Sequence, residues 1–335
     1  MKRYGNLYPQ IYDFSNLELS YKKARRCKRF RAEVLRFTER KEENLIDIQN
    51  HLIWKSYRPG EYRKFTVTEP KERQIMALPF RDRVMQHAVN NIIEPLFDKS
   101  FIYHTYACRK DKGAHKASDA LTGWLYEYHA AGKRAYCLKA DISKYFQSIH
   151  HGTLKWIIRK RIKCPDTLWI LDMIIDNSEC DTGRGIPVGN LSSQLFANIY
   201  LSELDRFVKH KLRIHHYMRY MDDFIILSDD KQALHGVLSE IHDFLEDELH
   251  LKLNPKTDIF PVKNGVDFVG YRHYHSHKKV RKSSIKRMNK RVKQFKEGKM
   301  PRERFIATLV SWLGHITHAD TWHLREKTLN KIGEF

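Results

Sequence analysis

Three aspartates stand where hydrophobic strands are expected to end. Asp222 and Asp223 lie between Tyr220-Met221 and the apolar run 224–227, and Asp141 ends the strand-like stretch 135–142. An ionised carboxylate at the end of a buried strand is unfavourable unless something offsets its charge. If the two strands are neighbours, Asp141 and Asp222 converge on one site, and such carboxylates hold the paired divalent cations that support in-line phosphoryl transfer. The alternative is that the turn contains Asp only because Asp tolerates turn geometry.

The charge balance of the chain predicts a polyanionic partner for this chemistry. Lys and Arg number 61 against 40 Asp and Glu in 335 residues, which gives a formal net charge of +21. This excess favours nucleic acid or an anionic membrane surface. The 41% apolar and 30% charged residues are typical of a globular chain and exclude a disordered one. Around a basic groove, the expected reaction is nucleotidyl transfer.

Three further observations bear on the cellular setting. No apolar run approaches the roughly 18 residues that a membrane-spanning helix needs. The first residues lead into no apolar segment, so we do not expect secretion. The five cysteines show no C-x-x-C spacing, which indicates free thiols in a reducing compartment. We therefore expect a cytoplasmic protein without a membrane partner.

The excess charge is concentrated in two segments. Seven of the ten residues 22–31 are basic, and residues 278–299 contain eleven basic residues against one acid, Glu297. In the second segment Ile285, Met288, Val292 and Phe295 recur at helical spacing, with Ser283 or Ser284 as a cap. The opposite face would be nearly all Lys and Arg. Because so many like charges would repel one another, this face is expected to bind phosphates rather than remain merely solvated.

The elements that position these residues form a mixed pattern. We expect helices at 17–40, 42–54, 83–97, 192–208 and 232–249, and strands at 62–68, 73–78, 135–142 and 266–271, with two short strands within 217–227. Three helical segments end the chain, namely the basic one, 303–317 and 322–332. This order predicts an α+β fold.

Five motifs in this order resemble those of reverse transcriptases. They are Lys139–Phe146, Gly185–Gln194 with the following 195–201, Tyr220–Asp223, Asn254–Thr257 and Phe268–Tyr271. The resemblance covers nearly the whole chain and implies a right-hand polymerase fold with fingers, an antiparallel palm sheet and a helical thumb. It implies a basic helical extension at 1–60, fingers and palm at 61–275, and a basic thumb at 276–335.

Within this family the chain is most similar to the reverse transcriptases of diversity-generating retroelements. Group II intron enzymes carry Gln-Gly and Ser-Pro in the helix motif, where this chain has Val188-Gly189 and Ser193-Gln194. The resemblance implies a bacterial, archaeal or phage-encoded enzyme that copies a template RNA with misincorporation opposite adenines. Its implied partners are template RNA, the RNA/DNA hybrid, dNTPs and a small basic, oligomeric accessory protein.

The same resemblance assigns catalytic roles. Asp141 and Asp222 would hold two Mg²⁺ ions, for which Mn²⁺ could substitute, together with the backbone of Ile142. Asp223 would belong to the metal site and tune it without being an essential ligand. Phe146 would be a steric gate that rejects ribonucleotides, with Tyr145 the next candidate.

The remaining residues with implied roles bind nucleotides or the template–primer. Lys71 and Arg73 would contact the triphosphate, and Lys256 would protonate the departing pyrophosphate. Val188 and Gly189 would pack under the nucleotide or template base. Template and primer would be contacted by Gln194, Gly270, Tyr271, Lys286, Arg287, Lys290 and Arg291.

Two other functions remain open on the sequence. One is a retron or group II intron-like reverse transcriptase without programmed mutagenesis. The other is a non-catalytic RNA-binding scaffold, which the presence of all three aspartates disfavours because a scaffold has no use for buried metal ligands.

Overall fold

The fold is described from a computed structural model, which covers residues 2–68, 72–177 and 183–333. The chain divides into two units that it visits alternately. Unit 1 consists of residues 1–103, 142–213 and 240–255, and unit 2 consists of residues 104–141, 214–239 and 256–335. Among the described residues, no helix is both long and apolar enough to cross a bilayer.

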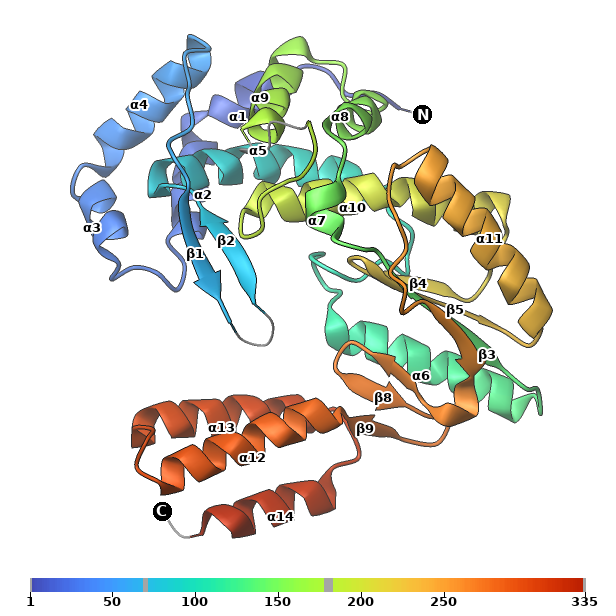
Figure 1. The fold of residues 1–335 in the computed structure, drawn as a ribbon. Helices are drawn as coiled ribbons and strands as arrows, with labels where there is room; N and C mark the ends of the chain where they lie inside the picture. The colour runs from blue at the N-terminus through green and yellow to red at the C-terminus, as the bar shows by residue number, and fades with distance from the viewer. Residues whose placement is uncertain (1, 69–71, 178–182, 334–335) are drawn as a thin grey trace. The chain divides into compact units, whose positions relative to one another are not determined.

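Unit 1 is mainly helical and carries one exposed two-stranded sheet (Figure 1). Its helices are α1 (Tyr8–Tyr12), α2 (Phe14–Ala24), α3 (Ala32–Glu39), α4 (Lys41–Ile53), α5 (Phe80–Asp98), α7 (Tyr145–Ser148), α8 (His151–Arg159), α9 (Pro165–Asp176) and α10 (Leu191–Arg206), which continues as the π-helix η1 (Phe207–Lys211). Its strands are β1 (Arg63–Val67) and β2 (Arg73–Ala77), paired antiparallel from Arg63 with Ala77 to Val67 with Arg73. Helix α11 (Lys231–Asp247) begins in unit 2 and ends in unit 1.

Unit 2 contains two antiparallel sheets, the long helix α6 (Ala114–Ala130) and a helical module. The first sheet has the strand order β4-β5-β3-β6, from β3 (Tyr136–Asp141), β4 (Tyr217–Tyr220), β5 (Asp223–Ser228) and β6 (Asp258–Pro261). The 3-10 turn η2 (Val262–Asn264) leads to the second sheet, formed by β7 (Val266–Phe268), β8 (Tyr271–His273) and β9 (Lys278–Val280).

Helix α6 packs against the first sheet and forms a core with it. Leu121 and Leu125 of α6 are buried together with Cys137 of β3 and Ile225 and Leu227 of β5. The central strands are buried along most of their length, which is why they appear in the sequence as nearly continuous apolar runs. Strand ends that carry aspartates are thereby anchored to a rigid core.

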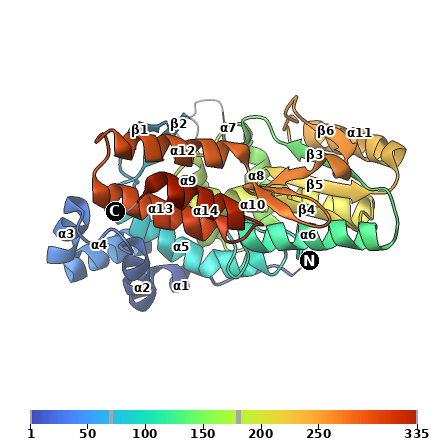
Figure 2. The same ribbon diagram turned by 90° about the horizontal axis from the view of Figure 1, so that it is seen from below.

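The C-terminal helices α12 (Lys282–Lys296), α13 (Arg302–Ile316) and α14 (Trp322–Ile332) pack on one another in unit 2 (Figures 1 and 2). Their common core includes Met288, Val292, Phe305 and Leu309. The expected apolar stripe is confirmed, but the expected serine cap is wrong. Helix α12 has no side-chain cap, and the Ser284 hydroxyl instead accepts a hydrogen bond from Trp312 Nε1 at 3.2 Å.

Two sequence-based elements differ from the structure. The helix expected at 17–40 is broken between α2 and α3, where Cys27 has φ +59° and short-range bonds join Lys28 N to Arg25 O and Arg31 N to Lys28 O. Crowded like charges disfavour a continuous helix through this basic run. The strand expected at 266–271 is instead a hairpin of β7 and β8 with Phe268 paired to Tyr271. Helices α6, α8 and α9 and strands β6 and β9 were not expected.

Candidate functional site

The register of the first sheet places two of the aspartates side by side. Strands β3 and β5 pair antiparallel, and Asp141 is the register partner of Asp223. Directly opposite residues in such a pair have Cβ atoms about 4.5–5.5 Å apart and lie on the same face. Met221 and Asp222 form the two-residue loop between β4 and β5, so Asp222 directly precedes Asp223, the first residue of β5. The expected neighbourhood of the two aspartate-bearing strands is therefore confirmed.

Asp223 lies in an environment that disfavours its charge. Burial raises the pKa of Asp223 to about 6, and the neighbouring Asp141 and Asp222 add to the rise, while Lys139 and Arg281 oppose it. The Lys139 ammonium lies 4.0 Å from Asp223 Oδ2. The other oxygen, Oδ1, is buried and has no hydrogen-bond partner among the described residues. A buried carboxylate oxygen without a donor leaves a place for a cation.

The donor set fits a hard divalent cation. In the described part of the chain, His, Cys, Asp and Glu side chains form no group of three or more placed to hold a metal by themselves. Mg²⁺, however, is commonly held by one or two carboxylates together with waters and substrate phosphates, so a complete protein cage is not required. The Asp141–Asp223 pair, in which Asp223 Oδ1 is buried without a hydrogen-bond partner among the described residues, meets that requirement.

The loop that carries Asp222 has an unusual backbone. Met221 has φ +59°, whereas Asp222 is not among the described residues with positive φ. A positive φ at the first loop position is typical of a tight hairpin turn in which glycine usually occupies that position. The Arg219 guanidinium donates a hydrogen bond to the Met221 carbonyl oxygen at 2.8 Å.

Three of the expected nucleotide-binding residues of unit 1, namely Arg73, Val188 and Gly189, lie in or against the β1–β2 hairpin. Arg73 is the exposed first residue of β2, and Met76 of the same strand donates its backbone N–H to Val188 O at 3.1 Å. Gly189 has φ +117°, and a Cβ there would lie 2.9 Å from Ile75 Cγ2. A side chain at position 189 would therefore be both strained and crowded. Lys71 lies outside the described residues.

The two candidates for the sugar gate differ in burial. Tyr145 is 2% exposed, and its hydroxyl donates to Ala197 O at 2.6 Å. Phe146 is half-buried, and its carbonyl accepts from Ile186 N at 2.8 Å. Tyr145 is thus committed to the core of unit 1, which leaves Phe146 as the aromatic side chain with an accessible face.

Three other residues with expected roles, Gln194, Lys256 and Ile142, differ in their exposure to solvent. Gln194 on α10 and Lys256 are exposed. Ile142 is buried, and its backbone forms an isolated antiparallel bridge with Leu253. These placements put Ile142 and Gln194 in unit 1 and Lys256 in unit 2.

Two of the expected template–primer residues lie at the β7–β8 hairpin, Gly270 in its turn and Tyr271 at the start of β8. Val269 (φ +42°) and Gly270 (φ +97°) form its two-residue loop, and positive φ at both positions is typical of a type I′ hairpin. Tyr271 is fully buried, stacks on His315 at 4.8 Å and donates its hydroxyl to His315 O at 2.8 Å. Burial raises the pKa of Tyr271 to about 12, so this hydroxyl stays protonated at neutral pH.

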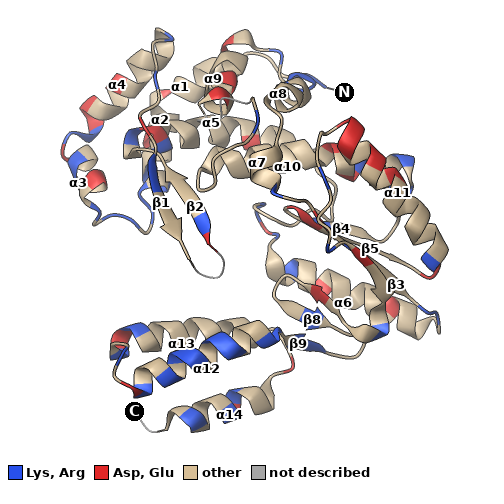
Figure 3. Ribbon diagram, viewed as in Figure 1, with Lys and Arg blue, Asp and Glu red and all other residues tan. Residues whose placement is uncertain are grey.

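Helix α12 presents a row of cations (Figure 3). Lys286, Arg287 and Lys290 are exposed, and Arg291 is half-buried with Nη1 donating to Gln294 Oε1 at 3.2 Å. Buried Met288 and Val292 hold the opposite face of the helix against α13 and α14. The helix therefore separates an apolar side from a basic one, as expected.

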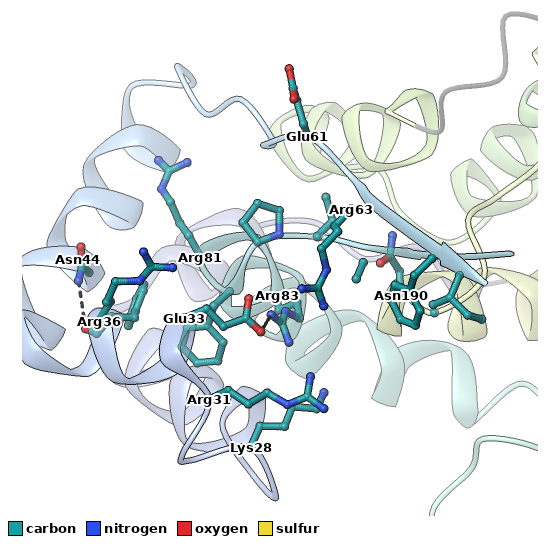
Figure 4. A pocket seen from close by; sticks show the side chains of 18 residues that line it. Lys28, Arg31, Glu33, Arg36, Asn44, Glu61, Arg63, Arg81, Arg83 and Asn190 are labelled. Atoms are coloured by element: carbon teal, nitrogen blue, oxygen red, sulfur yellow. Dashed lines mark hydrogen bonds and ion pairs between the residues drawn. The ribbon is translucent and has the colours of Figure 1, made fainter. Parts of the chain in front are cut away.

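Sequence reasoning missed a basic pocket in unit 1 with a volume of about 670 Å³ (Figure 4). Its charged lining residues are Lys28, Arg31, Glu33, Arg36, Glu61, Arg63, Arg81 and Arg83, and Gly189 and Asn190 also line it. Glu33 is ion-paired with Arg83, whose Nε atom is buried without a partner among the described residues. The basic run 22–31 was one available signal, but nothing in the sequence placed it near Arg63 and Gly189.

The cations of this pocket crowd one another. Burial, together with the charges of Arg83 and Arg31, lowers the pKa of Lys28. Figure 4 shows Lys28, Arg31 and Arg63 extending toward the region of Arg83. Such an arrangement favours an anion, since a bound negative charge would relieve the repulsion.

Comparison with known proteins adds sequence relatives. Residues 63–273, more than half of the chain, match the family model described as reverse transcriptase (RNA-dependent DNA polymerase). Over 266 residues the chain is 26% identical to protein YkfC of Escherichia coli, covering 67% of this chain and 70% of that protein. It is also 26% identical over 176 residues to the group II intron-encoded protein LtrA of Lactococcus lactis, covering 50% of this chain but only 28% of LtrA.

Solved structures show the same fold class. Apo telomerase from Candida tropicalis superposes with a TM-score of 0.50 and 13% identity, covering 71% of this chain and 53% of the telomerase chain. Telomerase from Candida albicans, solved with a fragment of telomeric RNA, gives a TM-score of 0.50 and 12% identity over 71% of this chain and 51% of that one. The chain thus spans about half of these neighbours, and the expected right-hand α+β fold class is confirmed.

Proposed function

This chain belongs to the reverse transcriptase family of RNA-dependent DNA polymerases, and from that membership we propose how its residues serve the reaction and in which setting it acts. The observation that carries the proposal is the pairing of Asp141 with Asp223 at the end of a buried sheet, next to Asp222. The proposed reaction is extension of a DNA primer by dNTPs on an RNA template.

We propose that Asp141 and Asp222 hold divalent cations, with Mg²⁺ as the physiological ion and Mn²⁺ as a substitute. When bound, such ions activate the primer hydroxyl and neutralise the triphosphate charge. Asp223 and the Ile142 backbone would complete the protein ligands, and Lys139, 4.0 Å from Asp223, would limit the excess negative charge before the cations bind. The buried Asp223 Oδ1, which has no hydrogen-bond partner in the described part of the chain, supports this assignment.

The remaining polymerase roles are assigned to residues of both units. Arg73 and Lys71 would bind the triphosphate, Lys256 would donate a proton to the pyrophosphate, and Phe146 would exclude the ribose 2′-hydroxyl. Val188 and Gly189 would pack under the base pair being formed. Gln194, Gly270 and the cations of α12 would contact template and primer. The side chain of Tyr271 is fully buried, so the contact expected of this residue would have to come from its backbone.

The basic pocket of unit 1 would hold template RNA. Its lining includes Gly189, which is on the proposed base-pair surface, and Phe65 adds an aromatic side chain that is 41% exposed. Phosphate-binding cations beside an exposed aromatic ring suit a single strand, whose unpaired bases stack on such rings. In domain terms, we propose a helical extension at 1–60, fingers and palm at 61–275 and a thumb at 276–335.

For the biological setting we propose a diversity-generating retroelement, in which the enzyme copies a template RNA with errors opposite adenine and works with a small basic accessory protein in the cytoplasm. Val188-Gly189 and Ser193-Gln194 support this setting. The similarity to LtrA favours the second candidate, a group II intron-like enzyme without programmed mutagenesis.

The first experiment supplies RNA template, DNA primer, dNTPs and Mg²⁺ to the purified chain. RNA-templated extension that disappears with EDTA is expected. A chain that binds the template–primer but never extends it would instead be an RNA-binding scaffold.

The second experiment separates the two settings by sequencing the cDNA. Substitutions concentrated opposite template adenines are expected for the first setting and absent for the second. In the first setting, Val188→Gln should lower misincorporation at adenines because a Gln side chain can brace its neighbours through hydrogen bonds and Val cannot. Equal error spectra in the two proteins would show that Val188 does not set fidelity.

A further inference from the structure

Arg219 is a fully buried cation next to the aspartate-bearing loop. Its side chain is 0% exposed and is among the largest fully buried side chains in the described structure. A guanidinium remains protonated in proteins, so its burial is unfavourable unless its donors are satisfied. One donor, Nη1, is 2.8 Å from the Met221 carbonyl oxygen.

That hydrogen bond spans the unfavourable part of the loop. Met221 adopts φ +59° without being glycine, and L-residues disfavour this region because Cβ approaches the following carbonyl oxygen. The carbonyl that Arg219 fixes belongs to the peptide bond between Met221 and Asp222. Holding that peptide plane therefore orients the backbone from which the Asp222 side chain projects.

The other end of Arg219 is anchored by its backbone. Its N–H donates to His104 O at 3.0 Å, and its carbonyl accepts from Tyr106 N at 3.0 Å. Within the sheet it is the register partner of Phe224, which is also fully buried. The Arg219 backbone is thus fixed by residues 104–106 on one side and by β5 on the other, while its guanidinium is bonded to the loop. Arg219 therefore links the sheet rigidly to the Met221 carbonyl.

We propose that Arg219 is a positioning residue, which holds Met221 in the left-handed conformation and thereby places Asp222 beside Asp141. The inference rests on the proposed function, since the placement of Asp222 matters for catalysis only if Asp222 is a metal ligand. In this proposal Arg219 acts through the Met221 carbonyl and the loop backbone, not by direct contact with substrate or cation.

The test introduces glycine at position 221, the residue whose carbonyl Arg219 contacts. Glycine adopts positive φ readily, so Met221→Gly should make the loop less dependent on Arg219. Arg219→Gln removes the charged fork, and Arg219→Lys keeps the charge but offers a point donor instead of a planar one. Both are made with and without Met221→Gly, and Met221→Gly alone gives the reference rate.

The expected result is a rate defect that glycine repairs. Arg219→Gln should lower kcat of primer extension about 10–100-fold, the size of effect expected from misplacing a reacting group by roughly 1 Å, while KM for dNTP changes by less than about 3-fold. Adding Met221→Gly should recover about 10-fold or more. Hydrogen exchange of residues 217–228 should become faster in Arg219→Gln, with exchange elsewhere in unit 2 unchanged.

Other outcomes would overturn the inference. A folded Arg219→Gln chain whose defect Met221→Gly does not repair, or whose loop exchanges at the native rate, would mean that Arg219 only fills the core. If Arg219→Gln does not fold, the Arg219→Lys pair, which retains the charge and most of the volume, decides by the same criteria. A native chain without RNA-templated extension would instead refute the proposed function, so the two failures are distinguishable.

Discussion

The two antiparallel hairpins β4–β5 and β1–β2 differ in burial, in the size of the sheet to which they belong and in the sign of their net charge. Strands β4 and β5 are buried along nearly their whole length and belong to a four-stranded sheet. Strand β1 is exposed throughout, β2 is exposed to half-buried, and they form a sheet of two strands only. The first hairpin carries acids at its turn, whereas the second carries Arg73 and basic-pocket residues such as Arg63.

The difference in burial indicates that the β4–β5 hairpin positions catalytic groups, whereas the β1–β2 hairpin binds substrate. Catalytic groups require placement to fractions of an ångström, which a buried sheet provides. A two-stranded hairpin in water is only marginally stable by itself, and here it is tied to the Val188 carbonyl through Met76 N at 3.1 Å. We therefore expect changes at β4–β5 to alter rate, and changes around β1–β2 to alter binding and selection.

The largest expected effect is at Asp222. Asp222→Asn should lower the primer-extension rate by about 10³-fold or more, because losing one carboxylate mispositions the bound cations, while RNA affinity stays within about 3-fold. Rate is measured by single-turnover extension and affinity by filter binding. Asp229→Asn, at an exposed residue paired with Lys133, is the matched control, and near-native extension by Asp222→Asn would contradict the metal assignment.

A substitution at Phe146 tests whether unit 1 selects dNTP over rNTP. Phe146→Ala should raise ribonucleotide incorporation about 10- to 100-fold, since removing the ring removes the clash with the 2′-hydroxyl and costs no hydrogen bond. Competition between dNTP and rNTP at a single template position measures it. An unchanged preference for dNTP would mean that Phe146 is not the gate and would leave Tyr145 as the next candidate. Because the Tyr145 hydroxyl is bonded to Ala197 O, we expect Tyr145→Phe to lower the free energy of unfolding more than the preference for dNTP over rNTP.

Gly189 tests the connection between the base-pair surface and β2. Gly189→Ala combines strain at φ +117° with a 2.9 Å approach to Ile75, so we expect a loss of about 1–3 kcal/mol in the free energy of unfolding and a raised KM for dNTP. Gly113 has a similar φ of +109° but nothing within 4 Å. Gly113→Ala should therefore lose only about 1 kcal/mol, from strain alone, and equal losses would show that the close approach is unimportant.

The smallest expected effects are electrostatic. Replacing Lys286, Arg287, Lys290 or Arg291 singly by Glu should weaken template–primer binding and reduce the slope of log affinity against log salt by about 0.7–0.9 for each phosphate that is no longer neutralised. Titrations between low and physiological salt measure the slope. Lys231→Glu, at an exposed residue on α11, is the control, and slopes identical to it would make the α12 face merely solvated.

Much of the fold was predictable because the buried strands of unit 2 are nearly uninterrupted apolar runs. The elements that were missed had weaker signals. Helix α6 has His, Tyr and Trp among its apolar residues and no side-chain cap, and β8 is only three residues long. The 266–271 hairpin was missed because Val269, a β-branched residue, adopts φ +42°, a conformation that such residues rarely occupy.

Of the candidate site, apolar patterning predicted two strands that end at aspartates, and these strands are neighbours in the sheet. Their register, which pairs Asp141 with Asp223, was not predictable because it depends on long-range pairing rather than on local pattern. It did not predict the basic pocket, because that pocket assembles cations from α3, β1 and α5 with the loop before α3. Tertiary contacts that join distant segments leave no local periodicity. Nor could spacing alone show that the Tyr145 hydroxyl is bonded in the core to Ala197 O whereas Phe146 is only half-buried.

The strand order of the catalytic sheet has a consequence for how the chain is made. Strand β3 ends at Asp141, but both of its partners come later, β5 at 223–228 and β6 at 258–261. A ribosome adding roughly 5–20 residues per second needs about 6–24 s for the 120 residues from 141 to 261. Both edges of β3 therefore lack partners until residue 228 has been made, and one edge lacks its partner until residue 261. Unpaired strand edges promote association with other chains, so nascent chains stalled before residue 261 should be the species that aggregate or recruit chaperones.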